Sequence, residues 1–217
     1  MKSGLIKVWR EYRSFALFIV LMIIFRSALA DWNVVPTGSM KPTIIEGDRI
    51  LVNKLAYDLR IPLTRISIHK FADPRRGDIV VFDSKAADIR LVKRVIGLPG
   101  ETVEMRNNRL IIDGREARYS GVGHAADATF AIESYDGMTH RIELAGTGAH
   151  RFSTFGPVTV PKNRYLVLGD NRDNSADSRV YGFIPREEIV GNAKTVVLSL
   201  DYDHYYVPRA ERFFRAL

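Results

Sequence analysis

The sequence contains no cysteine, so disulfide bonds, thiolate metal sites and a cysteine nucleophile are all excluded. It also lacks the His-x-x-x-His spacing with which one helical turn clamps a metal ion. We therefore expect no metal and no other cofactor, and we expect most of the isolated histidines to lie on the surface or in loops. These histidines are His69, His124, His140, His150 and His204.

Recognition of nucleic acid has little support in the sequence. A net charge of +7 would suit either nucleic acid or anionic lipid. The lysines and arginines are scattered along the chain, however, and no nucleic-acid-binding motif is present. We therefore expect no nucleic-acid partner, and we interpret the positive charge as suited to an anionic membrane surface.

The N-terminal segment joins a basic stretch, residues 1–13, to an uninterrupted apolar run, Phe15–Phe25. The basic flank should remain cytoplasmic. The run is shorter than the roughly 20 residues that cross a bilayer, and Ser27–Ala30 looks like the small-x-small cleavage site of a secretory leader. Arg26 favours a membrane anchor over residues 14–32, because a charge there is unusual in a leader but can snorkel at the end of an anchor. These residues leave both interpretations open, and both place the chain after Trp32 across the membrane.

The remainder of the chain has the pattern of a mostly β protein. Short apolar or alternating runs, among them RILVNKL, GDIVVFD, IRLVKRVIGL and AKTVVLSL, are separated by turn residues. They predict an antiparallel, barrel-like or sandwich-like domain made of residues 33–114 and 160–217. Between them, residues 115–159 are richer in Gly, Ala, His and Thr, which predicts an inserted small β subdomain where we expect no chemistry.

Three polar segments raise the question of chemistry: Pro36–Ile44, Leu91–Glu101 and Leu168–Pro185. Each has an ordinary explanation when it is taken alone. PTGSMKPTI is rich in turn residues, and a lysine such as Lys93 on a strand is most often solvated. The aspartates of LGDNRDNSAD suggest a calcium loop, but Arg172 occupies a ligand position, and the required glycine and terminal glutamate are missing.

Taken together and in order, these segments resemble the bacterial type I signal peptidase, or leader peptidase, family. The resemblance covers the apolar N-terminal segment followed at once by the Ser-Met-x-Pro box, GDRILVNK, GDIVVF, KRVIGLPGE and GDNRDNSADSR. Residues 115–159 carry little of it. The resemblance implies a serine endopeptidase that removes N-terminal signal peptides from exported preproteins after a small-x-small site such as Ala-x-Ala.

Carried over by position, the resemblance implies that Ser39 is the nucleophile and Lys93 its general base. A serine hydroxyl must lose its proton as it attacks, and a lysine can accept that proton only when neutral. The pKa of Lys93 must therefore be lowered from about 10.4 by burial among apolar groups. Leu91 and Val95 lie on the same face of the predicted strand and would supply such surroundings.

The remaining site residues are also implied by the resemblance. Ser175 would orient the Lys93 amine, and the Ser39 backbone N–H with the Thr37 hydroxyl would form the oxyanion hole. Structural support is expected from Asp170, Asp177, Arg179 and Arg94. The walls of the pockets for small substrate side chains are expected to include Val35, Met40, Ile44, Leu91 and Val92.

The resemblance further implies that the apolar segment is retained as a single anchor in the inner (plasma) membrane. The N-terminus would then be cytoplasmic and the catalytic domain would lie on the periplasmic side. The expected partners are signal peptides of exported preproteins, the phospholipid membrane and the export machinery. Two alternatives are a maturation peptidase of the same superfamily in a conjugation or pilus system, and a secreted noncatalytic β protein whose leader is residues 1–30.

Overall fold

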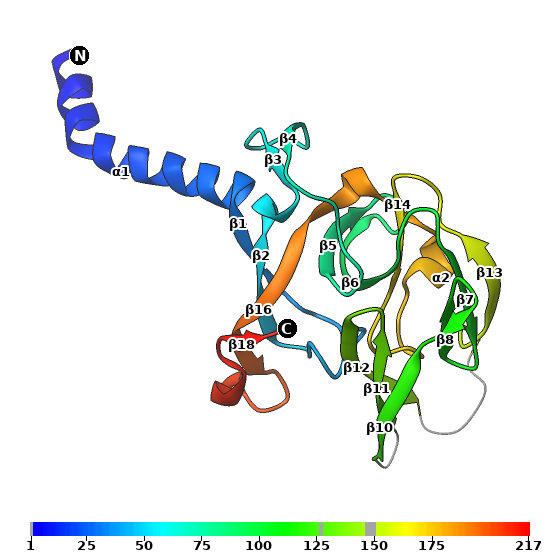
Figure 1. Cartoon of the computed structure of the whole chain (residues 1–217). Coiled ribbons are helices and arrows are strands. Elements are labelled where there is room, and N and C mark those ends of the chain that lie inside the picture. The colour runs from blue at the N-terminus through cyan, green and yellow to red at the C-terminus, as the bar shows by residue number, and fades with distance from the viewer. Residues whose placement is uncertain (1, 126–127, 146–150) are drawn as a thin grey trace.

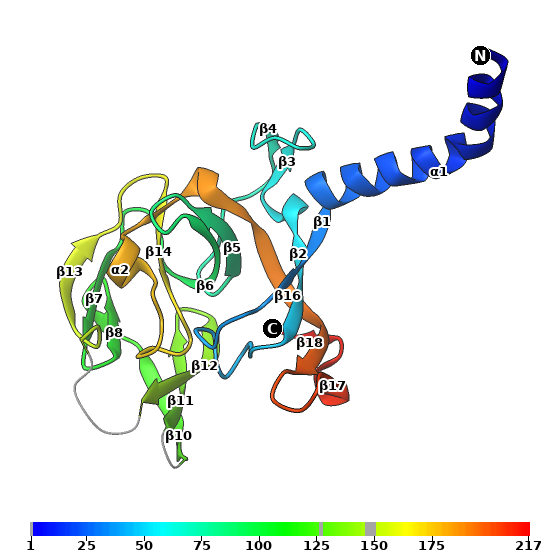
Figure 2. The same cartoon turned by 180° about the vertical axis from the view of Figure 1, so that it is seen from behind.

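The computed structural model describes residues 2–125, 128–145 and 151–217, and it consists mostly of antiparallel β-sheets. One helix, α1 (Lys2–Ala28), projects from the β-structure, as Figure 1 shows in blue and Figure 2 shows from behind. The N-terminus lies at the far end of α1, whereas the C-terminus lies beside the main sheet. Of the five histidines, His150 lies outside the described residues.

The main sheet has an open path of strands. Its spatial order is β1 (Ala30–Val34), β2 (Asp48–Asn53), β16 (Ile189–Asp201), β5 (Ile79–Ser84), β6 (Ile89–Gly97), β14 (Arg164–Leu168) and β15 (Ile184–Pro185). Two short strands, β17 (Val207–Pro208) and β18 (Arg215–Ala216), pair with β16 off this path. Because β1 and β15 end the path without pairing to each other, no closed barrel forms among the described strands.

Three smaller sheets accompany the main one. Their orders are β13 (Phe155–Thr159), β7 (Thr102–Arg106), β8 (Arg109–Ile112), β9 (Arg115–Glu116); then β10 (Arg118–His124), β11 (Ala128–Tyr135), β12 (Met138–Ala145); and β3 (Asp58–Arg60), β4 (Ser67–Lys70). The short helices are η1 (Lys54–Ala56), α2 (Ser178–Tyr181), η2 (Arg186–Glu188) and η3 (Ala210–Arg212). Within the range 115–159, β10 to β12 form a sheet of their own, whereas β9 and β13 pair with β8 and β7.

Two tight turns explain the hairpins of the smaller sheets. Asn107 and Asn108 join β7 to β8, and Asp136 and Gly137 join β11 to β12, all four with positive φ. Positive φ at both central residues defines the type I′ turn, whose twist matches that of antiparallel strands and which favours Asn, Asp and Gly. These turns set the register that places Glu133 opposite His140.

The main sheet is buried on both faces around β5. Ile79 and Val81 belong to one apolar cluster, whereas Val80 and Phe82 belong to another. Successive side chains of a strand point to opposite faces, so a strand covered on both sides becomes a continuous apolar run such as this one. The second half of the neighbouring strand β6 is buried as well, from Lys93 to Gly97, whereas Ile89 and Arg90 are exposed.

Two strand edges remain open beside that lysine. β6 pairs with β14 only from Arg94 to Gly97, which leaves the edge of residues 89–93 without a partner on that side in the described structure. β1 pairs only with β2, so its other edge is open as well. The fold thus exposes backbone donors and acceptors of two strands next to the candidate site.

The N-terminal helix ends before the predicted anchor does. α1 stops at Ala28, and residues 30–32 belong to β1. The large apolar side chains of the helix from Phe15 to Phe25 are exposed, with Met22 partly covered. Within the described part of the chain, no helix combines the length and the apolarity that a membrane crossing requires.

Candidate active site

Ser39 and Lys93 meet at the open edge of β6. Ser39 lies in the turn that follows β1, and its Oγ is 2.6 Å from Lys93 Nζ. The lysine is 2% exposed. The fold therefore places a hydroxyl and an amine within hydrogen-bonding distance, as activation of a serine by a lysine requires.

Burial makes the lysine amine suitable as a base. Removal from water disfavours the ammonium form and, with a smaller contribution from Arg179, lowers the pKa of Lys93 to about 8. The carboxylates of Asp177 and Asp170 oppose this effect. A substantial fraction of the amine is therefore neutral slightly above neutral pH, where it can accept the proton of Ser39.

A glycine allows the loop after β14 to contact the turn that carries Ser39. A Cβ atom placed on Gly169 would lie 2.4 Å from the Ser39 carbonyl oxygen and 2.3 Å from Ser175 Oγ. Both separations are far below van der Waals contact. Only glycine fits between Ser39 and Ser175, so the Gly169–Ser175 loop is packed directly behind the serine.

The structure places Ser175 beside the pair but without the expected hydrogen bond to Lys93. Its Oγ is buried and has no hydrogen-bond partner among the described residues. Thr37, in contrast, is exposed and lines the cleft next to Ser39. Thr37 therefore lines the same cleft as Ser39 and Lys93, and Ser175 lies across Gly169 from the Ser39 carbonyl, without a hydrogen bond to Lys93 among the described residues.

Asp177, which caps α2 just after this loop, and Arg179 in α2 form a buried ion pair. Arg179 donates from Nε and Nη2 to the Asp177 carboxylate at 2.8 and 2.7 Å, and it also donates to the carbonyls of Phe152 and Arg172. Asp177 in turn accepts the Gly169 N–H at 3.0 Å. Burial alone would raise the pKa of Asp177, but Arg179 holds it below its usual value, so the carboxylate remains ionised.

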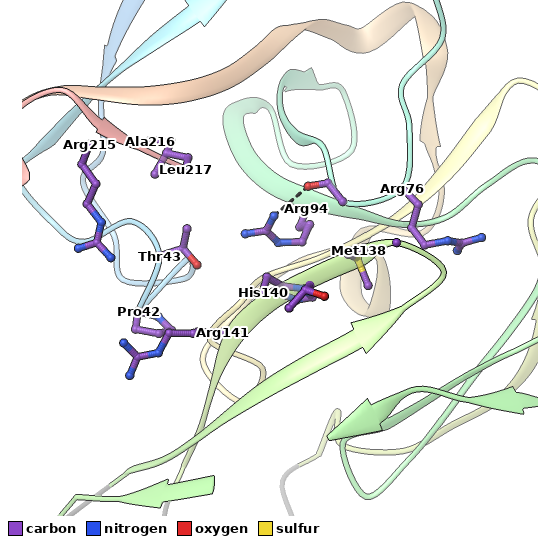
Figure 3. A pocket seen from close by; sticks show the side chains of 13 residues that line it. Pro42, Thr43, Arg76, Arg94, Met138, His140, Arg141, Arg215, Ala216 and Leu217 are labelled. Carbon is purple, nitrogen blue, oxygen red and sulfur yellow. Dashed lines mark hydrogen bonds between the residues drawn. The ribbon is translucent and has the colours of Figure 1, made fainter. Parts of the chain in front are cut away.

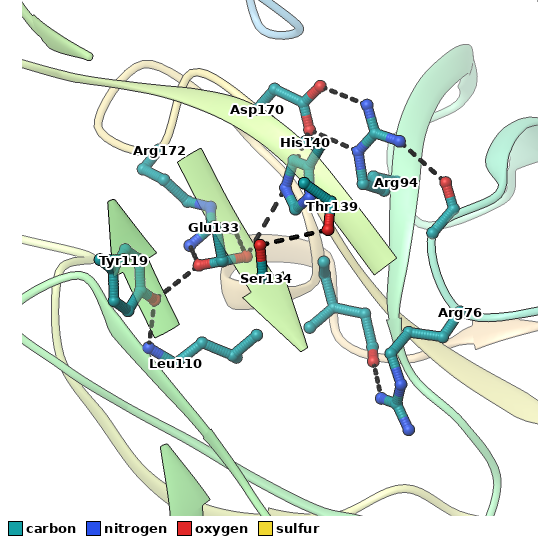
Figure 4. Close-up of polar contacts among 12 residues, drawn as sticks. Arg76, Arg94, Leu110, Tyr119, Glu133, Ser134, Thr139, His140, Asp170 and Arg172 are labelled. Carbon is teal, nitrogen blue, oxygen red and sulfur yellow. Dashed lines mark hydrogen bonds and ion pairs between the residues drawn. The ribbon is translucent and has the colours of Figure 1, made fainter. Parts of the chain in front are cut away.

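Arg94 and Asp170 form a second buried pair on the other face of β6. Arg94 Nε and Nη2 donate to the two Asp170 oxygens at 2.8 and 2.7 Å, and Nη1 donates to the Gly77 carbonyl. Thr43, from the turn that carries Ser39, donates its hydroxyl to Asp170 at 2.5 Å. This pair, drawn in Figure 4, therefore ties together the strand of Lys93, the turn of Ser39 and the loop after β14.

A polar network from the range 115–159 extends this pair, although the sequence predicted no chemistry there. Arg172 donates to both oxygens of Glu133 on β11 at 2.7 and 2.5 Å, and both side chains are fully buried. Tyr119 donates its hydroxyl to the same carboxylate at 2.6 Å. As Figure 4 shows, these side chains converge between the sheet of β10 to β12 and the loop after β14. This sheet therefore holds the loop in place.

His140 on β12 is an exception to the expectation that most of the histidines lie on the surface or in loops. It is buried, and its Nε2 lies 3.6 Å from carboxylate oxygens of both Glu133 and Asp170. Burial lowers the pKa of His140 to about 4, and the nearby Arg94 adds to this, although Asp170 opposes it. The ring is therefore neutral at physiological pH. Glu133 faces His140 across the β11–β12 hairpin. It lies 39 residues from Arg172, and Asp170 lies outside this hairpin, so the sequence contains no local signal for the contacts of these two carboxylates with Arg172 and His140.

An apolar cleft of about 380 Å³ opens beside the Ser39–Lys93 pair. Val35, Met40, Leu91 and Val92, four of the five predicted pocket residues, line it together with both members of the pair. The fifth, Ile44, is fully buried in the apolar cluster behind Val35 and Met40 and does not line this cleft. Trp32 and Ile89 also line the cleft.

A second hollow, of about 430 Å³, lies at the turn after Ser39 and is drawn in Figure 3. Its lining includes Thr43, Arg76, Arg94, His140 and Arg141, and no carboxylate side chain or lysine. The hollow therefore offers no base of the Lys93 kind to activate a hydroxyl. No group of three or more His, Asp or Glu side chains able to hold a metal occurs in the described ranges.

Known proteins resemble this chain over most of its length. The family model described as signal peptidase, peptidase S26, matches residues 8–198. A signal peptidase I of Pseudomonas aeruginosa is 35% identical over 205 residues, which cover 87% of this chain and 72% of the relative. A signal peptidase I of Bacillus amyloliquefaciens is 34% identical over 189 residues, with 87% and 84% coverage. A solved signal peptidase I from Enterococcus faecalis is 30% identical and covers 57% of this chain and 98% of its own, with a TM-score of 0.37.

Proposed function

This chain belongs to the signal peptidase family, peptidase S26, and is a serine endopeptidase; we propose that it cleaves signal peptides from exported preproteins with Ser39 and Lys93. The observation that carries the proposal is the 2.6 Å distance between Ser39 Oγ and the buried Lys93 amine. It is supported by the lowered pKa of Lys93. No histidine takes part in the proposed reaction.

The proposed reaction begins when neutral Lys93 takes the proton of Ser39 as Oγ attacks the scissile carbonyl carbon. The carbonyl π electrons move to its oxygen, and the negative charge would be stabilised by the Ser39 N–H and the Thr37 hydroxyl. Collapse of this intermediate breaks the C–N bond, and the Lys93 ammonium protonates the leaving amine. Lys93 then accepts a proton from water as the water attacks the acyl-enzyme, and it returns that proton to Ser39.

The pH dependence of cleavage should follow the ionisation of Lys93. The reaction needs the neutral amine, and the pKa of Lys93 is lowered to about 8. We therefore expect kcat/KM to rise by about tenfold per pH unit at acidic pH and to level off above the pKa of the free enzyme. Initial rates with a substrate that has no titrating groups near the cleavage site would measure this. A profile that falls as pH rises through 8 would contradict the assigned base.

The proposed substrate binds as an extended chain between two open edges. The free edges of β1 and of residues 89–93 both border the cleft, and main-chain hydrogen bonds to such edges give affinity without sequence specificity. Alternate side chains of the leader would then enter the apolar space formed by Val35, Met40, Leu91 and Val92. Shallow apolar walls fit the small residues one and three positions before the cut, such as those of Ala-x-Ala.

Cleavage of a purified preprotein whose signal peptide ends in Ala-x-Ala would test the function and its specificity. Replacing the alanine before the cut by aminobutyrate, one methylene larger, should lower kcat/KM by about 10- to 200-fold. The same replacement two residues before the cut is the control, because that side chain points away from the pocket. Equal rates for all three substrates would contradict the pocket assignment. A maturation peptidase of a conjugation or pilus system would cleave its own precursor and leave this preprotein intact.

We further propose that α1 holds the enzyme at the membrane, with its N-terminus cytoplasmic and the catalytic residues on the periplasmic side. The exposed apolar side chains of the helix support this, as does Arg26, which pairs with Asp31 at the end of the helix. The phospholipid membrane and the export machinery would then be partners. The mass of the protein extracted from its host membrane tests the proposal, since a mature chain beginning at Asp31 would instead identify residues 1–30 as a cleaved leader.

A further inference from the structure

We infer that Asn171 is a positioning residue that orients the Gly38–Ser39 peptide so that its N–H faces the substrate carbonyl oxygen. This inference rests on the proposed function, because it concerns the oxyanion hole of that reaction. Asn171 lies in the loop after β14 and is 5% exposed. It has no assigned role in the reaction described so far.

Two hydrogen bonds join Asn171 to the turn of the nucleophile. Its side-chain Nδ2 donates to the Gly38 carbonyl at 3.2 Å, and its backbone N–H donates to the Ser39 carbonyl at 3.1 Å. The first bond acts on the peptide unit whose other end is the Ser39 N–H. In a planar trans peptide the C=O and N–H point in opposite directions. Holding the Gly38 oxygen against the loop therefore directs the Ser39 N–H away from the loop, toward the cleft.

Asn171 is itself held by the inserted sheet. Its Nδ2 also contacts Glu143 Oε1 at 3.3 Å, so both amide hydrogens have acceptors. On either side of Asn171, the Glu143 N–H donates to the Asp170 carbonyl and the Arg172 N–H donates to the Glu143 carbonyl, both at 2.9 Å. β12 thus fixes the backbone that carries Asn171. The geometry of the oxyanion peptide is determined in part by strands far from it in the sequence.

The donor role of the Asn171 amide can be tested by substitution. Asn171→Asp keeps the size and shape of the side chain but replaces two donors by acceptors, which would face the Gly38 oxygen and the Glu143 carboxylate. The repulsion should rotate the Gly38–Ser39 peptide. Asn171→Ala removes the donor without repulsion, and Gly38 then keeps the Lys41 N–H as a donor at 3.0 Å. The aspartate variant should therefore be the more impaired.

The experiment uses the full chain and compares its affinity for a mimic of the charged intermediate with its affinity for the uncleaved substrate. Removing an oxyanion donor typically costs about 10²- to 10³-fold in rate, so Asn171→Asp should lower kcat/KM by up to about 10²-fold and Asn171→Ala by about tenfold. The probe is a peptide aldehyde ending in Ala-x-alaninal, to which Ser39 Oγ bonds while its proton passes to Lys93 and the aldehyde oxygen takes the negative charge. Its affinity should fall by the same factors as kcat/KM.

Ground-state binding supplies the discriminating readout. In a Ser39→Ala background, which keeps the backbone N–H, the dissociation constant of the uncleaved preprotein should change by less than about twofold with Asn171→Asp, because only the charged intermediate needs that N–H. Asn174→Asp is the matched control, since Asn174 is an exposed asparagine of the same loop. It should leave both affinities and the rate unchanged.

Two outcomes would overturn the inference. One is an equal loss of aldehyde affinity and ground-state affinity, which indicates general disruption of the site. The other is wild-type kcat/KM in both Asn171 variants while Ser39→Ala is inactive. If Asn171→Asp fails to fold, the aldehyde affinity of Asn171→Ala still tests the inference. Full turnover by Ser39→Ala would instead refute the proposed function, so the two failures are distinguishable.

Discussion

Replacing Ser39 by alanine, or Lys93 by methionine, is expected to lower kcat for preprotein cleavage by roughly 10⁴-fold or more. Alanine has no oxygen to attack the scissile carbon. Methionine fills a similar volume without an amine, so the buried site stays packed while the base is lost. The two side chains act as one unit across their 2.6 Å contact. Single-turnover cleavage of a preprotein by each purified variant would measure the loss.

The double variant and a matched surface variant complete this test. Residues that act as a unit are strongly non-additive, so Ser39→Ala combined with Lys93→Met should be no slower than either single variant. Lys162→Met is the control, because Lys162 is exposed in the segment before β14, and it should retain wild-type turnover. Near-normal cleavage by either single variant would show that another group carries the reaction.

Replacing Arg172 by methionine is expected to lower the free energy of unfolding by about 3 to 5 kcal/mol. The change leaves the fully buried Glu133 carboxylate without the guanidinium that accompanies it. Burial raises the pKa of Glu133, and Arg172 is the largest influence that holds it below its usual value. Without Arg172, folding must either bury an unpaired charge or protonate the glutamate. Chemical denaturation at neutral pH would measure the loss.

The same pair gives a second, opposite expectation. Removing both charges, with Arg172→Met and Glu133→Leu together, should recover much of the lost stability, because apolar residues of similar volume often replace a buried ion pair at little cost. The exposed pair Lys85–Glu187 is the matched control, and Lys85→Met should change stability by at most about 1 kcal/mol. A double variant as unstable as the sum of the single variants would show that the pair is not the source of the effect.

The stability of this network also bears on activity. Arg172 and Glu133 join the loop after β14 to the inserted sheet, and Asn171 of that loop contacts the peptide of Ser39. Variants of the ion pair should therefore lose activity as the loop loosens, even under conditions where the protein remains folded. The strands β10 to β12 are therefore part of the support of the candidate site.

Much of the local structure could be predicted from the sequence. The apolar run of β5 and the alternating pattern of its neighbours indicated strands, because side-chain direction in a strand repeats every two residues. The mostly antiparallel β fold was confirmed. The family was recognised from boxes in their order, and the match over residues 8–198 confirms it. The roles given to Ser39, Lys93, Thr37 and Ser175 remain proposals that rest on that resemblance.

Other features could not be predicted because they depend on which residues folding brings together. The sequence placed Ile44 in a pocket wall, but packing against Val35 and Met40 buries it in the core. The expected bond from Ser175 to Lys93 is not formed among the described residues, because Ser175 Oγ is buried without a hydrogen-bond partner. The barrel remains open because β1 and β15 do not pair.

The sequence by itself determined the kind of protein: the strand-forming runs, the turn residues between them, the absence of cysteine chemistry and the ordered boxes of a signal peptidase. These are local properties, since periodicity and turn preference act within a few residues. Only the tertiary structure decided that Lys93 is desolvated enough for its pKa to fall to about 8, that Glu133 is the partner of Arg172, and that Asn171 holds the Gly38 carbonyl. Burial and contact over distances of 2.5 to 3.2 Å are set by the packing of segments distant in the chain, and no local pattern encodes them.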